Sequence, residues 1–145
     1  MTTTPLPAAD ATARLERQEV GGPAPGETLD IAATAERSGV TAHTLRYYER
    51  IGLISVDRDA AGHRRYSPAA FARVVFLSRL RMAGMSMRDL QRYVALAEDG
   101  EHTVPERLAM LHTHRDAVRA RLAELQFALR TIEYKIDTYG GELAP

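Results

Sequence analysis

The residues best suited to binding chemistry lie in one ten-residue stretch, TAHTLRYYER, at positions 41–50. It holds two arginines and two adjacent tyrosines. A guanidinium group can fork onto a phosphate or onto a guanine edge, and a tyrosine hydroxyl can donate to a phosphate. The stretch therefore predicts a surface that contacts nucleic acid.

A helix over residues 42–51 would divide this stretch into two faces. At 100° per residue, Leu45 and Tyr48 fall on one side and are expected in the core. The opposite side would present Tyr47 together with the arginines. We expect the DNA contacts of this helix from Thr41, His43, Thr44, Arg46, Tyr47 and Arg50. His43 could instead act as a pH switch, but its place on this face favours a DNA contact.

Capping residues and glycines predict the elements that hold the stretch in place. Asp30 can cap a short helix that ends at Gly39, and Thr41 can cap the next helix. Two short helices joined by such a turn are typical of a helix-turn-helix. Residues 53–56 and 63–66 are compatible with strands, and Gly62 lies between them, so the segment predicts a hairpin or wing.

Two further helices are expected after this hairpin. Ser67 followed by Pro68 opens a helix to about residue 83, which Gly84 ends. Ser86 can cap a fourth helix to about residue 96, with Asp89 completing a weak capping box. The core residues expected from the first of these helices are Phe71, Val74, Val75 and Leu77.

A heptad pattern follows Pro105 and continues to Tyr139 without a slip. Alternating spacings of three and four residues over more than four heptads predict one long helix with an apolar stripe. A domain of this size cannot cover such a stripe, so self-association is favoured over folding back onto the chain. Arg115 interrupts the stripe. The dimerisation residues expected are Leu108, Leu111, Val118, Leu122, Leu125, Leu129, Ile132 and Ile136.

Charge and composition narrow the classes of function. Residues 28–96 carry eleven arginines against six acids, a balance of +5, although the whole chain is neutral. A basic segment of this kind favours a polyanionic partner. The chain has no cysteine, no apolar run long enough to cross a bilayer and no signal-peptide pattern. We therefore expect a soluble cytoplasmic protein without a membrane partner.

Three blocks of sequence, IAATAERSGVTAHTLRYYERIGLI, GHRRYSPAAFARVVFLSRLRMAGMSMRDLQ and the heptad helix, together resemble the MerR family of bacterial transcription regulators. The resemblance covers about residues 28–139. It implies a mostly α fold: a winged helix-turn-helix followed by a long dimerisation helix, paired as an antiparallel coiled coil. We expect a disordered tail at 1–27, the DNA-binding domain at 28–97, the dimerisation helix at 104–139 and a short tail at 140–145.

The resemblance also implies a function and roles for particular residues. Dimers of this family bind inverted-repeat promoters whose spacer is too long and distort the DNA so that RNA polymerase can use it. Arg46 and Tyr47 would contact DNA from the helix, and Arg64 and Arg65 from the wing. Tyr48 and Tyr66 would hold the helix and the wing in place. The sequence departs from the family pattern at Thr34, an otherwise apolar position, and at Ser55 and Val56, where the family's wing begins with proline.

The ligand that such a protein would sense is not evident. Many relatives use cysteine for soft metals or electrophiles, and this route is closed here. We expect no cofactor and no metal site, because His112 and His114 point in different directions on a helix. The three methionines Met82, Met85 and Met87 are expected as gap-filling core. An effector pocket near the fourth helix would use Tyr93, His112 and Arg115, although for Arg115 a role in setting the register of the coiled coil is favoured over effector binding.

No arrangement of nucleophile and base, paired carboxylates or phosphate loop is present, so we expect no enzyme activity. Two alternatives to an effector-responsive regulator remain. One is an architectural DNA-binding protein of the same fold that needs no effector. The other is a coiled-coil interaction module whose basic domain binds protein, which the eleven arginines of residues 28–96 disfavour.

Overall fold

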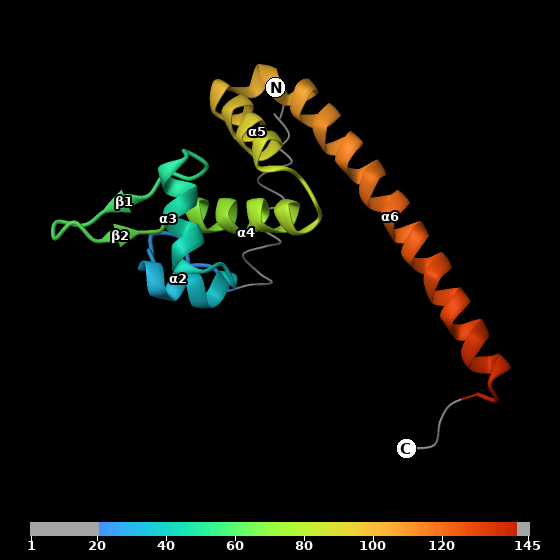
Figure 1. Ribbon diagram of the computed structural model, residues 1–145. Helices are drawn as coiled ribbons and strands as arrows, with labels where there is room; N and C mark the ends of the chain where they lie inside the picture. Colours follow the sequence, from blue (N-terminus) through green and yellow to red (C-terminus); the bar gives the residue numbers. More distant parts are fainter. Residues whose placement is uncertain (1–20, 142–145) are drawn as a thin grey trace. The chain divides into compact units, whose positions relative to one another are not determined.

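The protein is mostly helical, as predicted, and its chain divides into two compact units (Figure 1). The computed structural model describes residues 21–141. Most of the tail predicted at 1–27 and the last four residues of the tail predicted at 140–145 lie outside the described residues. Along the sequence, the boundary between the two units falls between Ala95 and Leu96. Within residues 21–141, no helix is both long enough and apolar enough to cross a membrane.

Helices α2 (Ile31–Ser38) and α3 (Ala42–Arg50) form the predicted helix-turn-helix. The Asp30 carboxylate accepts the Ala33 N–H at 2.7 Å, and the Thr41 hydroxyl accepts the Thr44 N–H at 3.2 Å, so both predicted caps are confirmed. Gly39 ends α2 at φ 75°, in the left-handed region that glycine enters without strain.

Thr34, the departure from the family pattern in α2, is fully buried. Its hydroxyl donates to the Asp30 carbonyl at 2.8 Å. A buried hydroxyl costs little when it is hydrogen-bonded, so the core accepts threonine at this apolar position.

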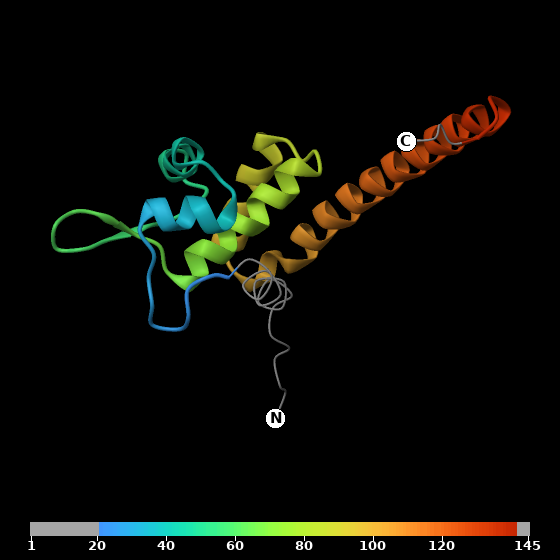
Figure 2. The same cartoon turned by 90° about the horizontal axis from the view of Figure 1, so that it is seen from below.

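The predicted hairpin is present, but its first strand was placed wrongly. Strands β1 (Asp57–Arg58) and β2 (Arg64–Arg65) pair antiparallel, with Asp57 opposite Arg65 and Arg58 opposite Arg64. The expected strand at 53–56 is wrong because Leu53 and Ile54 are buried core residues that precede the hairpin. We call residues 57–65 the wing; it projects from the helices of the first unit in both views (Figures 1 and 2).

Helices α4 (Pro68–Met82) and α5 (Met87–Asp99) complete the first unit's core, with α5 crossing into the second unit. Ser67 caps α4 and Ser86 accepts the Asp89 N–H at 3.1 Å, as predicted. Helix α5 continues three residues past the expected end. The core expected from α4 is confirmed, since the following side chains are all buried: Phe71, Val74, Val75 and Leu77.

The prediction of three core methionines is only partly correct. Met85 is buried, and Met87 packs partly buried against the core. Met82, in contrast, is 81% exposed. It is the last residue of α4, and Leu80 just before it is already only partly buried, so the buried part of the helix ends before Met82.

The second unit consists mainly of the long helix α6 (Val104–Thr138), preceded by the short 3-10 helix η1 (Glu101–Thr103). At 1.5 Å per residue, the 35 residues of α6 span about 50 Å. The buried Arg107 donates to the Thr103 hydroxyl at 3.0 Å, and that hydroxyl lies 2.6 Å from the Leu96 carbonyl. These contacts join the start of α6 to the end of α5. The single long helix predicted from the heptads is confirmed.

Candidate nucleic-acid interface

Helix α3 has a buried face and an exposed face, divided as the sequence predicted. Leu45 and Tyr48 are buried. His43, Arg46, Tyr47 and Arg50 are exposed, and Thr41 and Thr44 lie at the start of the helix. The outer face of this nine-residue helix therefore presents two guanidinium groups, one phenol and one imidazole.

Aromatic contacts hold Tyr47 in place on this face. Its ring lies 6.4 Å from the Tyr48 ring, centroid to centroid, and the Arg50 guanidinium carbon lies 5.5 Å from its centroid. Because Tyr48 is buried, Tyr47 rests against a fixed neighbour. Arg46 makes no hydrogen bond or ion pair within residues 21–141. Its donors are available to a phosphate or a base.

Thr41 and Thr44 have a structural use as well. The Thr41 hydroxyl lies 3.0 Å from the Thr44 hydroxyl, besides accepting the Thr44 N–H. Both hydroxyls are thus engaged in the cap of α3. A helix N-terminus of this kind points free N–H groups outward, which suits a phosphate.

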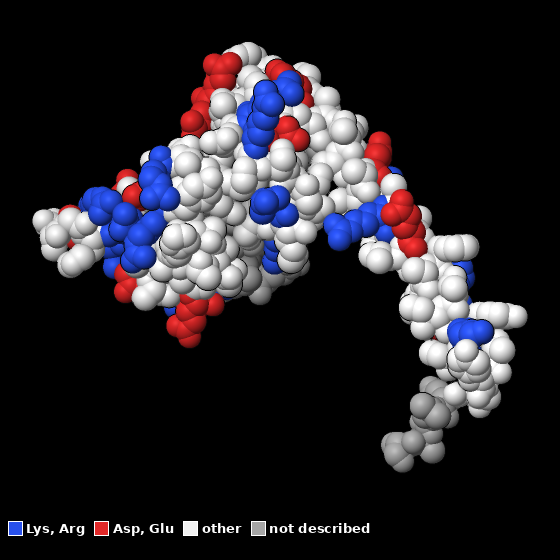
Figure 3. All heavy atoms as spheres, in the orientation of Figure 1, with Lys and Arg blue, Asp and Glu red and all other residues white. Residues whose placement is uncertain are grey.

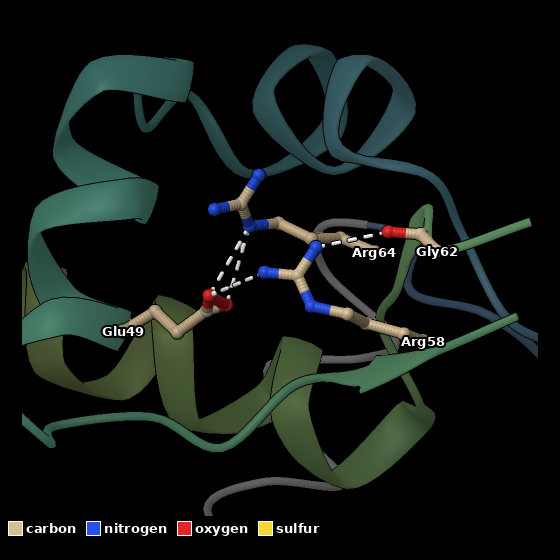
Figure 4. Close-up of polar contacts among 4 residues, drawn as sticks. All are labelled: Glu49, Arg58, Gly62 and Arg64. Carbon is tan, nitrogen blue, oxygen red and sulfur yellow. Dashed lines mark hydrogen bonds and ion pairs between the residues drawn. The ribbon is translucent and has the colours of Figure 1, made fainter.

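The Glu49 carboxylate joins α3 to the wing (Figure 4). It accepts the Arg64 Nε–H with both oxygens, at 3.2 Å each, and one oxygen also accepts from Arg58 Nη2 at 3.3 Å. Arg58 in turn donates from Nη1 to the Gly62 carbonyl at 2.9 Å. This carboxylate therefore pairs with two arginines of the wing at once.

The sequence predicted Arg64 at this surface but missed Glu49 and Arg58. Glu49 is nine residues from Arg58 and 15 from Arg64, so no local spacing connects them. The signal that could have found Arg58 is the hairpin register, in which it stands opposite Arg64. A first strand at 53–56, as expected from the sequence, would leave Arg58 outside the pairing.

Arg65, the other wing residue expected at the interface, contacts the segment before α2. Its Nε donates to the Thr28 hydroxyl at 3.0 Å and its Nη2 to the Thr28 carbonyl at 3.1 Å. The next residues, Leu29 and Tyr66, exchange backbone hydrogen bonds at 2.9 and 2.7 Å. The base of the wing is thus tied to residues 28–29 while Glu49 ties it to α3.

Tyr66 lies beneath this group of charges and is fully buried, in keeping with the supporting role expected of it. Its hydroxyl has no hydrogen-bond partner within the described residues. Burial raises the pKa of the Tyr66 phenol, and Glu49 adds to the rise while Arg64 opposes it. The phenol is therefore neutral at physiological pH.

The wing tip is closed by one exposed carboxylate. Asp59 accepts the backbone N–H groups of Ala61 and His63 at 3.0 and 2.9 Å. The hydrogen bond from His63 is the main cause that lowers the pKa of Asp59.

Figure 3 shows arginine side chains gathered where α3 meets the wing, interrupted by a few acids. This end of the first unit therefore suits an anionic partner.

The residues expected in an effector pocket belong to different units. Tyr93 is buried in the first unit, where its ring centroid lies 5.7 Å from that of Phe76. In the second unit His112 is exposed, and Arg115 pairs with its neighbour Asp116 at 3.2 Å. Within residues 21–141 no group of three or more histidine, aspartate or glutamate side chains could hold a metal ion.

Comparison with known proteins connects this architecture to one family. The model of the MerR helix-turn-helix family regulatory proteins matches residues 29–96, and the MerR DNA-binding model matches residues 71–134. An uncharacterised helix-turn-helix transcriptional regulator of Haemophilus influenzae is 34% identical over 113 residues, covering 77% of this chain and 84% of the relative.

Two solved structures are similar along most of the chain. One is a Listeria monocytogenes protein assigned to the MerR family of transcriptional regulators, with 39% identity and a TM-score of 0.72, covering 77% of this chain and 85% of that one. The other is HiNmlR, a regulator that lacks the sensor domain and is bound to promoter DNA. It has 34% identity and a TM-score of 0.71, covering 77% of this chain and 90% of that one.

Proposed function

The chain belongs to the MerR family of helix-turn-helix regulatory proteins, and from this premise we propose that it regulates transcription as a homodimer bound to promoter DNA. The observation that carries the proposal is the outer face of α3, where Arg46 has free donors and Tyr47 is fixed beside Arg50. HiNmlR, which is similar over most of the chain, is bound to promoter DNA. A regulator of bacterial promoters acts in the cytoplasm.

The contacts to DNA divide by chemistry. Arg46 is the residue for a base edge, since a guanidinium forks onto guanine O6 and N7. The remaining residues proposed from the sequence suit phosphates, which fix the position of the protein without specifying sequence. They are Thr41, His43, Thr44, Tyr47, Arg50, Arg64 and Arg65.

The stripe on α6 supports the homodimer. The eight stripe residues from Leu108 to Ile136 are exposed or only partly buried in the single chain. A stripe of this length on a helix of about 50 Å is typical of a two-stranded coiled coil. In the proposed dimer two copies of α6 pair antiparallel. A symmetric dimer of this kind requires an operator with two inverted half-sites.

The proposed regulation acts through the shape of the promoter. Each surplus base pair in a spacer moves one promoter element about 3.4 Å along the axis and about 35° around it. A dimer that holds both half-sites can offset this by untwisting or bending the DNA, at a cost on the order of 1–6 kcal/mol. RNA polymerase would then engage the corrected promoter. A dimer that bound the same site without this distortion of the DNA would repress transcription.

An effector, if this protein has one, must bind without a thiol, since the chain has no cysteine. We expect such an effector to be an organic or anionic molecule that binds non-covalently. Such a molecule would bias the dimer between two states only by binding one of them more tightly. A purely architectural role needs no effector and is the second candidate.

Replacing Arg46 with alanine tests the proposal. Losing a base-reading arginine should weaken operator binding by about 1–3 kcal/mol and relax sequence choice at one position. The matched control is Arg130→Ala, which removes the same charge from an exposed residue of α6. Binding is measured on an operator selected by the parent protein from a randomised pool of duplexes. Arg46→Ala protein that binds this operator as tightly as the parent would refute the assignment of α3.

A further inference from the structure

Glu49 is an acid in the last turn of α3, the helix that the proposed function places against DNA. By charge alone it should weaken DNA binding, because its carboxylate repels phosphates. The structure instead shows Glu49 in contact with the wing. Its side chain is only 21% exposed, and its two oxygens receive three hydrogen bonds from two wing arginines.

The wing requires external support to hold its position. Its strands are only two residues long each, and an isolated hairpin is marginal at best in water. Arg58 and Arg64 stand directly opposite each other in the register. Two like charges facing one another across a hairpin destabilise it. The Glu49 carboxylate accepts hydrogen bonds from both arginines and so offsets part of that repulsion.

The arginines keep donors after these contacts are made. Arg64 uses only Nε on Glu49, which leaves both of its terminal nitrogens. In Figure 4 the two nitrogens of Arg64 that bear no dashed line point away from Glu49. Arg58 bridges Glu49 and the Gly62 carbonyl, so it joins α3 to the wing near its tip. Together these contacts fix two guanidinium groups beside the exposed face of α3.

We propose that Glu49 is a positioning residue for DNA binding: it holds Arg58 and Arg64 so that the wing and α3 meet the same DNA backbone. Arg58 is then a third wing arginine that contacts phosphate, beside Arg64 and Arg65. The inference rests on the proposed function and adds to it a requirement for an acid at the interface. Positioning and simple charge make opposite predictions about removing this acid.

The test compares Glu49→Gln with Asp57→Asn. Each variant removes one negative charge, and Asp57 is an exposed wing residue whose carboxylate makes no hydrogen bond or ion pair within residues 21–141. We expect Glu49→Gln to weaken binding to the selected operator about tenfold, while Asp57→Asn leaves it unchanged or slightly tighter. The salt dependence separates causes, since each lost phosphate contact lowers the slope of log K against log salt by about 0.9. Glu49→Gln should lower it by up to about 2, for two arginines.

A second background keeps the test decisive if Glu49→Gln also loosens the fold. In a protein that carries Arg58→Ala and Arg64→Ala, Glu49 has no wing arginine to position, so Glu49→Gln should no longer weaken binding. Amide hydrogen exchange should rise in residues 57–65 of the single variant and stay unchanged in α4.

Three results would decide against the proposal or its premise. Glu49→Gln protein that binds as tightly as Asp57→Asn would overturn the positioning role while leaving the proposed function intact. Equal weakening by Glu49→Gln in the parent and in the double-arginine background would assign Glu49 to the fold alone. A parent that binds no duplex at all would remove the proposed function, and this inference with it.

Discussion

Changing Leu122 and Leu125 to aspartate should separate the two copies of the proposed dimer. Both residues lie near the middle of α6, where an antiparallel pair brings the same turns of the two helices together. Each variant chain places two carboxylates against the partner's stripe. Like charges would then face each other in the only long apolar surface of the second unit's described residues.

The magnitude follows from the exposure of the stripe. Leu122 is 52% exposed and Leu125 is 58% exposed in the single chain. Full burial of a leucine contributes about 1.5–3 kcal/mol, so covering the exposed half contributes about 1 kcal/mol for each side chain. Four such side chains in the dimer amount to about 4 kcal/mol, or roughly a thousandfold in the dissociation constant. Desolvation of the new carboxylates adds several kcal/mol to the loss.

Sedimentation equilibrium over a concentration series measures this change. The matched control is Ala120→Asp with Ala123→Asp, which adds the same charge on the face of α6 that the heptad pattern directs away from the stripe. The control should stay dimeric and bind DNA, while the leucine variant should be monomeric and bind DNA weakly. A leucine variant that dimerises as tightly as the control would refute α6 as the interface.

Three other changes have expected outcomes of their own. Tyr66→Phe should raise the free energy of unfolding by up to about 1 kcal/mol, because it removes a buried hydroxyl that has no partner. Because burial raises the pKa of Tyr66, the contribution of this residue to the free energy of unfolding is fully present below about pH 10 and is lost as pH rises through the folded pKa. Urea unfolding should therefore show a smaller loss of stability at alkaline pH for Tyr66→Phe than for the parent. Thr41→Ala should cost about 0.5–2 kcal/mol, since it removes the cap of α3, and thermal unfolding measures that loss. Peroxide, copper and zinc should leave operator binding and promoter transcription by the purified protein unchanged, and a strong direct response to either metal would show that the histidines and methionines form a metal site.

The local elements of this fold could be predicted because their causes are local. The caps at Asp30, Thr41 and Ser67 are hydrogen bonds to a backbone N–H three residues ahead. The glycine that ends α2 is required by a left-handed backbone conformation. The buried face of α3 follows from the helix period, which places Leu45 and Tyr48 together. Each of these features is complete within one or two turns of chain.

The first strand of the wing was predicted wrongly because two physical causes give the same pattern. Leu53 and Ile54 read as strand residues, but they are apolar because they fill the core next to Tyr48. Their backbone does not pair with the second strand; the Leu53 N–H donates to the Tyr48 carbonyl instead. Burial depends on how the whole unit packs. Sequence alone therefore does not distinguish apolar residues of a buried loop from apolar residues of a buried strand.

The sequence by itself determined the helix-turn-helix, the outer face of α3, the single long α6 and its unpaired stripe, since each follows from spacings along one segment. Only the tertiary structure decided which groups meet between segments. Glu49 meets Arg64 across 15 residues, and Arg65 meets Thr28 across 37. Such pairs depend on the path of the chain through the turn and the hairpin, and an exposed arginine and a paired one are the same letter in a sequence.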